Sequence, residues 1–147
     1  MARKAAKRTV EQFVLDGSVT LAWFFKDEAD PYADAIAARF PDVQGLVPAV
    51  WPLEVANAVL MGERRRRSTE AQAARWLRRL SSLPITIDDE TMSRAWSDVL
   101  NLARAQGLSA YDAAYLELAL QRGLPLATLD QRLKAAAAAV GVGEYNP

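Results

Sequence analysis

The segment Phe13-Val14-Leu15-Asp16-Gly17-Ser18 combines a short apolar run with a carboxylate and a glycine-containing turn. Three consecutive apolar residues bounded by such a turn are typical of a strand buried on both faces. Asp-Gly-Ser is typical of a turn that leads into a helix. The segment therefore predicts a buried strand whose carboxyl end presents Asp16.

Similar short apolar segments recur along the chain, and helical periodicity fills the stretches between them. Further strands are predicted at residues 45–47, 85–87 and 126–129. Helices are predicted at residues 31–40, 50–67, 69–80, 90–106, 109–122 and 131–140. This alternation indicates an α/β domain with a parallel sheet covered on both faces. The two helices between the second and third strands indicate a helical hairpin on that core.

The size and charge of the chain fit one soluble domain. It has 147 residues, of which 51% are hydrophobic, and 18 basic residues balance 18 acidic ones. Residues 1–10 are basic without balancing acids before position 11, so they are predicted to form a flexible tail, and residues 11–147 a single domain. No apolar run reaches the roughly 18 residues of a membrane helix. The lack of cysteine fits a reducing cytoplasm.

The chain contains neither histidine nor cysteine. It therefore has no Ser-His-Asp triad, no Cys-His nucleophile pair and no thiolate zinc site. Hydrolytic chemistry would have to come from carboxylates, either as general acids and bases or as ligands of a hard cation.

Four carboxylates are predicted to meet at one edge of the sheet. Asp16 and Asp130 directly follow predicted strands, whereas Glu54 and Asp112 lie in the first turns of predicted helices. In a parallel α/β sheet these strand ends and helix starts share the edge where ligands bind. Crowded carboxylates stay ionised only when a cation holds them, and Mg²⁺ or Mn²⁺ suits such oxygen ligands. A bound ion of this kind would activate water for attack on a phosphodiester.

Most of these acids also have a structural interpretation. Asp16 and Asp130 suit helix N-caps, and Asp112 would close a capping box with Ser109. The hydroxyls of Ser18 and Thr128, each two residues from an aspartate, are candidates to support a ligating carboxylate or are ordinary turn hydroxyls.

Glu54 is harder to explain as a structural residue. Between Val50 and Gly62 only Glu54 and Asn57 carry polar side chains, one turn apart on the same face. A helix that is apolar nearly all round is predicted to be buried on most sides. A buried carboxylate needs a partner, so a metal ion or an arginine from elsewhere is expected beside Glu54, with Asn57 in support.

Four segments, taken in order, resemble the motifs of a known family. They are residues 13–18 (FVLDGS), 52–57 (PLEVAN), 109–116 (SAYDAAYL) and 126–130 (LATLD). Together they are similar to PIN domains, and most of all to the VapC toxins of toxin–antitoxin pairs. The resemblance implies a three-layer α/β/α fold with four or five parallel strands. It also implies Mg²⁺-dependent endoribonuclease activity, a homodimer and a cognate antitoxin.

Carried over position by position, the resemblance makes Asp16, Glu54, Asp112 and Asp130 the catalytic and metal-binding acids. Ser18 and Thr128 accompany them as hydroxyls. The same residues would also serve a PIN-type nuclease of RNA processing that is no toxin. A phospho-receiver-like regulatory module is disfavoured because the first strand ends in a single acid. An Asp-x-Asp phosphatase would need an acid where Ser18 stands.

The helix predicted at residues 50–67 ends in an arginine run, made of Arg64, Arg65, Arg66 and Arg67. Cations offset the dipole at a helix end, where such a run is usually a solvated face. Alternatively, the run is a rim that contacts RNA phosphates without reading sequence. Both interpretations stay open at this point.

The four tryptophans lie on apolar stripes of the sequence. Core or dimer-interface positions are therefore favoured over base-stacking platforms for Trp23, Trp51, Trp76 and Trp96.

Overall fold

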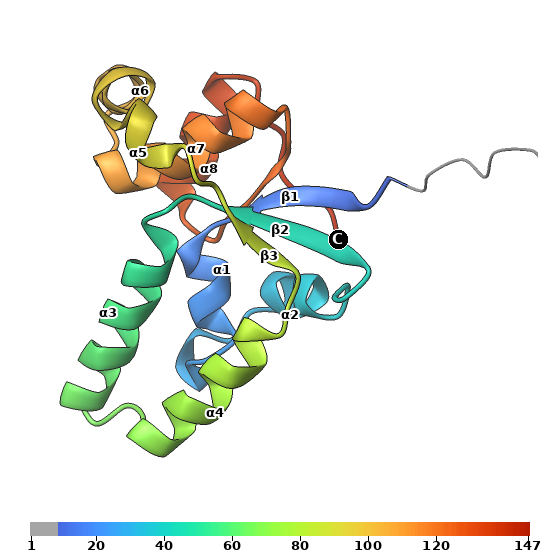
Figure 1. The fold of residues 1–147 in the computed structure, drawn as a ribbon, viewed down its shortest axis with the longest axis vertical. Helices are drawn as coiled ribbons and strands as arrows, with labels where there is room; N and C mark the ends of the chain where they lie inside the picture. Colours follow the sequence, from blue (N-terminus) through green and yellow to red (C-terminus); the bar gives the residue numbers. More distant parts are fainter. Residues whose placement is uncertain (1–8) are drawn as a thin grey trace, which may run out of the picture.

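The computed structural model describes residues 9–147 as a four-stranded parallel sheet between two groups of helices (Figure 1). The strands are β1 (Glu11–Leu15), β2 (Val43–Val47), β3 (Ile85–Ile87) and β4 (Leu126–Ala127), in the order β3-β2-β1-β4. All three pairings are parallel. The predicted tail lies outside the described residues, apart from the exposed Thr9 and Val10.

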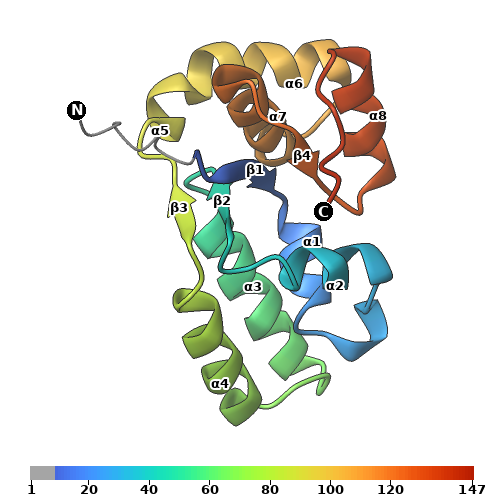
Figure 2. The same ribbon diagram turned by 90° about the vertical axis from the view of Figure 1, so that its right-hand side faces the viewer.

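The helices form the two outer layers of the predicted three-layer fold, which is confirmed. One side of the sheet carries α1 (Gly17–Ala22), α2 (Pro31–Ala37), α3 (Trp51–Arg64) and α4 (Glu70–Ser81). The other side carries α5 (Thr91–Arg94), α6 (Leu100–Gln106), α7 (Ala110–Arg122) and α8 (Gln131–Ala139). A single 3₁₀ turn, η1 (Lys26–Glu28), follows α1. The predicted hairpin is α3 and α4, which extend away from the sheet (Figure 2).

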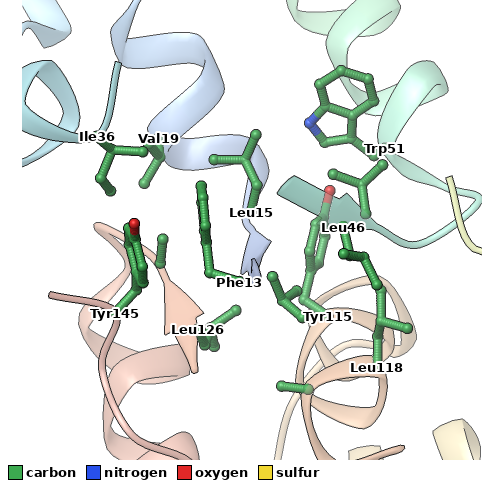
Figure 3. Close-up of a cluster of buried hydrophobic side chains, with 14 of the residues drawn as sticks. Phe13, Leu15, Val19, Ile36, Leu46, Trp51, Tyr115, Leu118, Leu126 and Tyr145 are labelled. Atoms are coloured by element: carbon green, nitrogen blue, oxygen red, sulfur yellow. The ribbon is translucent and has the colours of Figure 1, made fainter. Parts of the chain in front are cut away.

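β1 is central because its apolar residues have neighbours on every side. Phe13, Val14 and Leu15 are completely buried. Phe13 stacks on Tyr145 near the carboxyl end of the chain, with ring centroids 4.1 Å apart (Figure 3). Burying three such side chains stabilises the fold by several kcal/mol at about 25 cal/mol per Å² of apolar surface. The position of Asp16 directly after this strand is therefore firmly held.

β4 is shorter than predicted. Only Leu126 and Ala127 pair with β1, whereas Thr128 and Leu129 turn into the site described below. The outer side of β4 is covered by the last residues of the chain, where Leu126 donates to the carbonyl of Gly143 and accepts from the amide of Tyr145. This cover protects one edge of the sheet.

The helix predicted at residues 90–106 is interrupted by a π-helical turn, η2 (Ala95–Val99). Such a turn holds an extra residue, so it rotates the residues before it relative to those after it. Val99 and Ala103 keep their buried positions, but Met92 and Trp96 are exposed, Trp96 by 93%. Trp96 therefore does not lie in the core, and its alternative position in a dimer interface stays a prediction. Trp51 is buried as expected, and Trp23 and Trp76 pack against the core.

Within residues 9–147, no helix has both the length and the apolarity that crossing a membrane requires.

Candidate active site

The four predicted carboxylates lie at the carboxyl ends of strands and the amino ends of helices. Asp16 joins β1 to α1, and Asp130 stands three residues beyond β4 at the start of α8. Glu54 and Asp112 lie in the first turns of α3 and α7. Burial raises the pKa of Asp16, Glu54 and Asp112, and the charge of at least one other member of the four raises each further. The four acids thus share one electrostatic environment.

Asp16 is held by two hydroxyl groups. Its side chain is almost completely buried, and Oδ2 accepts hydrogen bonds from Ser18 Oγ at 2.5 Å and Thr128 Oγ1 at 2.8 Å. The amide of Ser18 also donates to Oδ2, at 3.4 Å, so Asp16 caps α1 as well. Burial raises the pKa of Asp16, and these hydrogen bonds oppose the rise because they stabilise the ionised form.

The same two hydroxyls join the ends of β1 and β4. Ser18 Oγ accepts from the amide of Leu129 at 2.9 Å, and Thr128 Oγ1 accepts from the amide of Asp130 at 3.0 Å. The hydroxyls of Ser18 and Thr128 are therefore hydrogen-bonded to Asp16 and to the backbone after β4, and they are not ordinary turn hydroxyls. They fix the spacing between Asp16 and the segment that carries Asp130.

Glu54 meets a tyrosine and a glycine. The hydroxyl of Tyr115 on α7 donates to Oε2 of Glu54 at 3.1 Å. A Cβ on Gly17 would lie 3.1 Å from the same oxygen, so glycine permits the close approach of Glu54 to the start of α1. The other oxygen, Oε1, is buried and has no hydrogen-bond partner. Burial raises the pKa of Glu54 to about 7, and the charges of Asp16 and Asp112 contribute.

Asp130 keeps the capping role that was its structural alternative, whereas the capping box predicted for Asp112 and Ser109 is only half formed. Oδ1 of Asp130 accepts from the amides of Arg132 and Leu133 at the start of α8. The amide of Asp112 donates to Ser109 Oγ, which caps α7. Burial and then the charge of Asp130 raise the pKa of Asp112, whereas the nearby Arg132 lowers it.

The carboxylates do not form a ready-made metal cluster. Across residues 9–147, no three acidic side chains lie in an arrangement that would hold a metal ion as they stand. The assignment of Asp16, Glu54, Asp112 and Asp130 as metal ligands therefore stays a prediction. Neighbouring donors already engage three of the acids, since Asp16, Glu54 and Asp130 accept hydrogen bonds from hydroxyls or helix amides.

The residues nevertheless suit a hard divalent cation in their chemistry. Glu54 Oε1 is a buried carboxylate oxygen without a partner, which is costly unless a cation or proton satisfies it. The hydrogen bonds to Asp16 from Ser18 and Thr128 all end at Oδ2, which leaves Oδ1 for another ligand. Mutual repulsion among these acids would be relieved by the same ion. The donor set therefore fits, although its members must close around the ion.

α3 is less buried than predicted. Asn57 is exposed, as are Pro52, Ala56 and Leu60, and Leu53 is 74% exposed. The helix packs on α1 through one face only, so its opposite face keeps apolar residues in solvent. The prediction of a helix buried on most sides is therefore wrong, whereas the supporting role of Asn57 stays a prediction.

The helix that carries the arginine run ends earlier than predicted. α3 stops at Arg64, so Arg65, Arg66 and Arg67 lie beyond it, and the prediction of a helix to residue 67 is wrong. The physical reason is the left-handed backbone of Arg66, whose φ of 58° is incompatible with a continuing right-handed helix. The amide of Arg67 then donates back to the carbonyl of Gly62 at 2.8 Å. The run is therefore a turn rather than a helical stripe.

All four arginines of the run are exposed, but they do not have the same surroundings. Arg67 is engaged within the chain, because its guanidinium pairs with Asp27 at 2.9 Å and lies 4.0 Å over the ring of Phe25. The members of the run that remain available to a phosphate are Arg64, Arg65 and Arg66.

Tyr115 and Gly17 are site residues that the sequence reasoning missed. Tyr115 follows Asp112 by three residues on a helix, a spacing that places both side chains on one face. This spacing could have flagged Tyr115. The role of Gly17 depends on the approach of Glu54 from another helix, which no local pattern reveals.

Glu54 should make the stability of the metal-free protein depend on pH. The raised pKa, about 7 against an ordinary 4.5, means that the folded state retains a proton that the unfolded state loses between these values. This contribution to stability is complete below pH 4.5, falls as pH rises and is gone above pH 7. We expect a loss of about 1–2 kcal/mol, because solvent screens a partly exposed group. Urea unfolding in EDTA should show this fall in the free energy of unfolding for the wild type, and Glu54→Gln should lack the part that Glu54 causes. Identical pH profiles for the two proteins would contradict the prediction.

The sequence and the structure of this chain are similar to those of proteins from one family. Residues 13–139 match the PIN domain. Ribonuclease VapC3 from Pyrobaculum aerophilum is 29% identical over 122 residues, which is 83% of this chain and 92% of the relative. The solved structure of PAE2754, also from Pyrobaculum aerophilum, is 28% identical, covers 86% of this chain and 80% of its own, and has a TM-score of 0.62.

Two further solved structures share the fold at lower identity. FitAcB from Neisseria gonorrhoeae is 19% identical with a TM-score of 0.60, over 92% of this chain and 97% of the other. VapC20 from Mycobacterium tuberculosis, a toxin that cleaves the sarcin-ricin loop, is 16% identical with a TM-score of 0.59, over 92% and 99%. The match over residues 13–139 covers most of the sequence, and the chain therefore belongs to the PIN-domain family.

Proposed function

We propose that this protein is a metal-dependent endoribonuclease and the toxin of a toxin–antitoxin pair. The PIN-domain match and the similarity to a VapC ribonuclease support a nuclease. The observation that carries the proposal is the shared environment of Asp16, Glu54 and Asp112, whose burial and mutual repulsion favour a cation among them. The names of the relatives favour the toxin role over RNA processing.

Asp16, Glu54, Asp112 and Asp130 would hold the cation, Mg²⁺ or Mn²⁺. When bound, such an ion offsets the negative charge of the site and stabilises the charge that develops on phosphoryl oxygens. The chain supplies the orientation. Ser18 and Thr128 hold Asp16 by two hydrogen bonds to Oδ2. Since the chain lacks histidine, the proton of an attacking water passes to a carboxylate or to solvent.

The toxin role can be tested in cells. Expression of the wild-type chain should arrest growth of a bacterial host, and co-expression of the reading frame adjacent to its gene should relieve the arrest. Normal growth of cells that express a folded, RNA-cleaving protein would favour a role in RNA processing over a toxin role.

Because its proposed substrate is cellular RNA, we propose that the protein acts in the cytoplasm.

A cognate antitoxin would have to meet the acidic site. The complementary ligand is a segment that places an arginine or lysine near Asp16 and Glu54 and apolar side chains beside them. Such a cation competes with the metal ion. We expect Mg²⁺ to weaken antitoxin binding in a calorimetric titration, and Glu54→Gln to weaken it without metal. If neither Mg²⁺ nor Glu54→Gln changes the affinity for the antitoxin, the antitoxin binds elsewhere on the chain.

The exposed face of α3 supports a homodimer. Leu53 and Leu60 are seven residues apart, which places them on the same side of the helix, with Ala56 between them. Contiguous exposed apolar side chains mark interaction surfaces. A second copy that covers this face would remove these side chains from water.

The arginine run is proposed as an RNA-contacting rim formed by Arg64, Arg65 and Arg66. Each phosphate contact to single-stranded RNA contributes about 0.7 to the slope of log affinity against log salt concentration, and about 0.9 to a duplex. Changing Arg64 and Arg65 to glutamine should therefore reduce the slope by about 1.4–1.8, with the cleavage sites unchanged. Arg104→Gln, a change of an exposed arginine on α6, serves as the control. An unaltered slope would make the run a solvated helix end.

A further inference from the structure

A tyrosine hydroxyl holds Glu54 from across the site. Tyr115 lies one turn beyond Asp112 on α7, and its side chain is completely buried. Its hydroxyl donates to Oε2 of Glu54 at 3.1 Å, the one side-chain hydrogen bond that Glu54 makes within residues 9–147. Figure 3 shows the ring extending from α7 toward the start of α3, where Trp51 lies. The contact thus links two helices that reach the site from opposite layers.

The backbone of α1 forms the third side of this contact. A Cβ at Gly17 would lie 3.1 Å from Glu54 Oε2 and 3.5 Å from the hydroxyl of Tyr115. The first distance is tighter than nine in ten real Cβ contacts, so a larger residue at position 17 would require the carboxylate to shift by a few tenths of an ångström. Oε2 is therefore enclosed by Tyr115 and Gly17. Oε1 is buried as well but has no partner.

We propose that Tyr115 is a positioning residue that holds Glu54 by Oε2, so that Oε1 is the oxygen offered to the cation. This inference rests on the function proposed above, since it assigns Glu54 to the metal. A ligand already held in its binding rotamer loses less freedom when the ion arrives. Outer partners of metal ligands typically contribute 10–100-fold in metal affinity.

The test is the affinity of the purified protein for Mn²⁺, measured from the electron paramagnetic resonance signal of the free ion. Tyr115→Phe keeps the ring and removes the hydroxyl. We expect it to weaken Mn²⁺ binding about tenfold. Tyr111→Phe, an exposed tyrosine on the same helix, is the matched control and should bind as the wild type does.

A second pair of variants separates positioning from a general structural effect. If Tyr115 acts only through Glu54, then Tyr115→Phe should have no further effect on Mn²⁺ affinity in a Glu54→Gln background. Wild-type affinity in the single variant Tyr115→Phe would overturn the inference. A tenfold loss that persists in the Glu54→Gln background would overturn it too, because Tyr115 would then act by another route.

The failure of this inference is distinct from the failure of the proposed function. A wild-type protein that binds no Mn²⁺ would overturn both, whereas a metal-binding protein indifferent to Tyr115→Phe overturns the inference alone. If Tyr115→Phe does not fold, the wild type labelled with 3-fluorotyrosine replaces it. The fluorine resonance of Tyr115, assigned by removing the other three tyrosines in turn, should shift when Mg²⁺ binds, and an unshifted resonance would overturn the inference.

Discussion

Replacing Asp16 with asparagine is expected to reduce RNA cleavage by more than about a hundredfold while the chain stays folded. Loss of an outer partner of a metal ligand costs about 10–100-fold, and loss of a ligand itself should cost more. Asparagine has nearly the same shape and still offers an oxygen to Ser18 and Thr128. The measurement is the initial rate of cleavage of labelled RNA in Mg²⁺.

The same substitution should preserve or raise stability without metal. Asp16 is a buried carboxylate whose pKa is raised by burial, so its negative charge opposes folding near neutral pH. Urea unfolding in EDTA should therefore give Asp16→Asn a free energy of unfolding at least equal to that of the wild type. Asp42→Asn, which changes an exposed aspartate, controls for the loss of charge. A fully active Asp16→Asn protein would remove Asp16 from the catalytic set.

Arg94→Met is expected to destabilise the protein by about 3–5 kcal/mol, the usual result of breaking a buried ion pair from one side. The guanidinium of Arg94 donates to Asp88 at 2.7 Å and to Glu117 at 2.8 Å. The side chains of both acids are almost completely buried. Arg122 reaches Asp88 at 3.4 Å, but Glu117 would keep no basic partner among the described residues.

This ion network joins elements that flank the active site. Thr91 donates to Asp88 at 2.9 Å and accepts from the amide of Ala49, just before α3. Glu117 lies on α7, the helix that carries Asp112. Urea unfolding at neutral pH measures the effect, with Arg104→Met as a control that should change stability by less than about 0.5 kcal/mol. A loss below about 1 kcal/mol for Arg94→Met would show that the acids are satisfied in another way.

The sheet and the placement of the acids were predictable because they follow from short-range patterns and one topological rule. Phe13 to Leu15 is apolar at every position, as expected for a strand buried on both faces, and the structure confirms it as the centre of the sheet. Parallel strands then bring their carboxyl ends to one edge. The PIN-domain family, predicted from four motifs in order, is confirmed by the match over residues 13–139.

The predictions that the structure contradicts concern features that depend on local backbone irregularities or on contacts between distant segments. The exposure of Trp96 results from a π-helical turn, which a period of 3.6 residues does not anticipate. The left-handed backbone of Arg66 ends α3 within a run of good helix formers, so composition gave no stop signal there. The exposure of Asn57 results from the packing of α3 through one face only. The hydrogen bond between Tyr115 and Glu54 joins residues 61 positions apart, so no local spacing predicts it.

The carboxylates at the edge of the sheet are proposed to cleave RNA with the help of a divalent cation. The most direct test follows cleavage of a labelled RNA by protein stripped of metal with EDTA and then titrated with Mg²⁺ or Mn²⁺. We predict no cleavage in EDTA, and cleavage that rises with the added ion and saturates. Cleavage that continues undiminished in EDTA would contradict the assignment of Asp16, Glu54, Asp112 and Asp130 to a metal-dependent site.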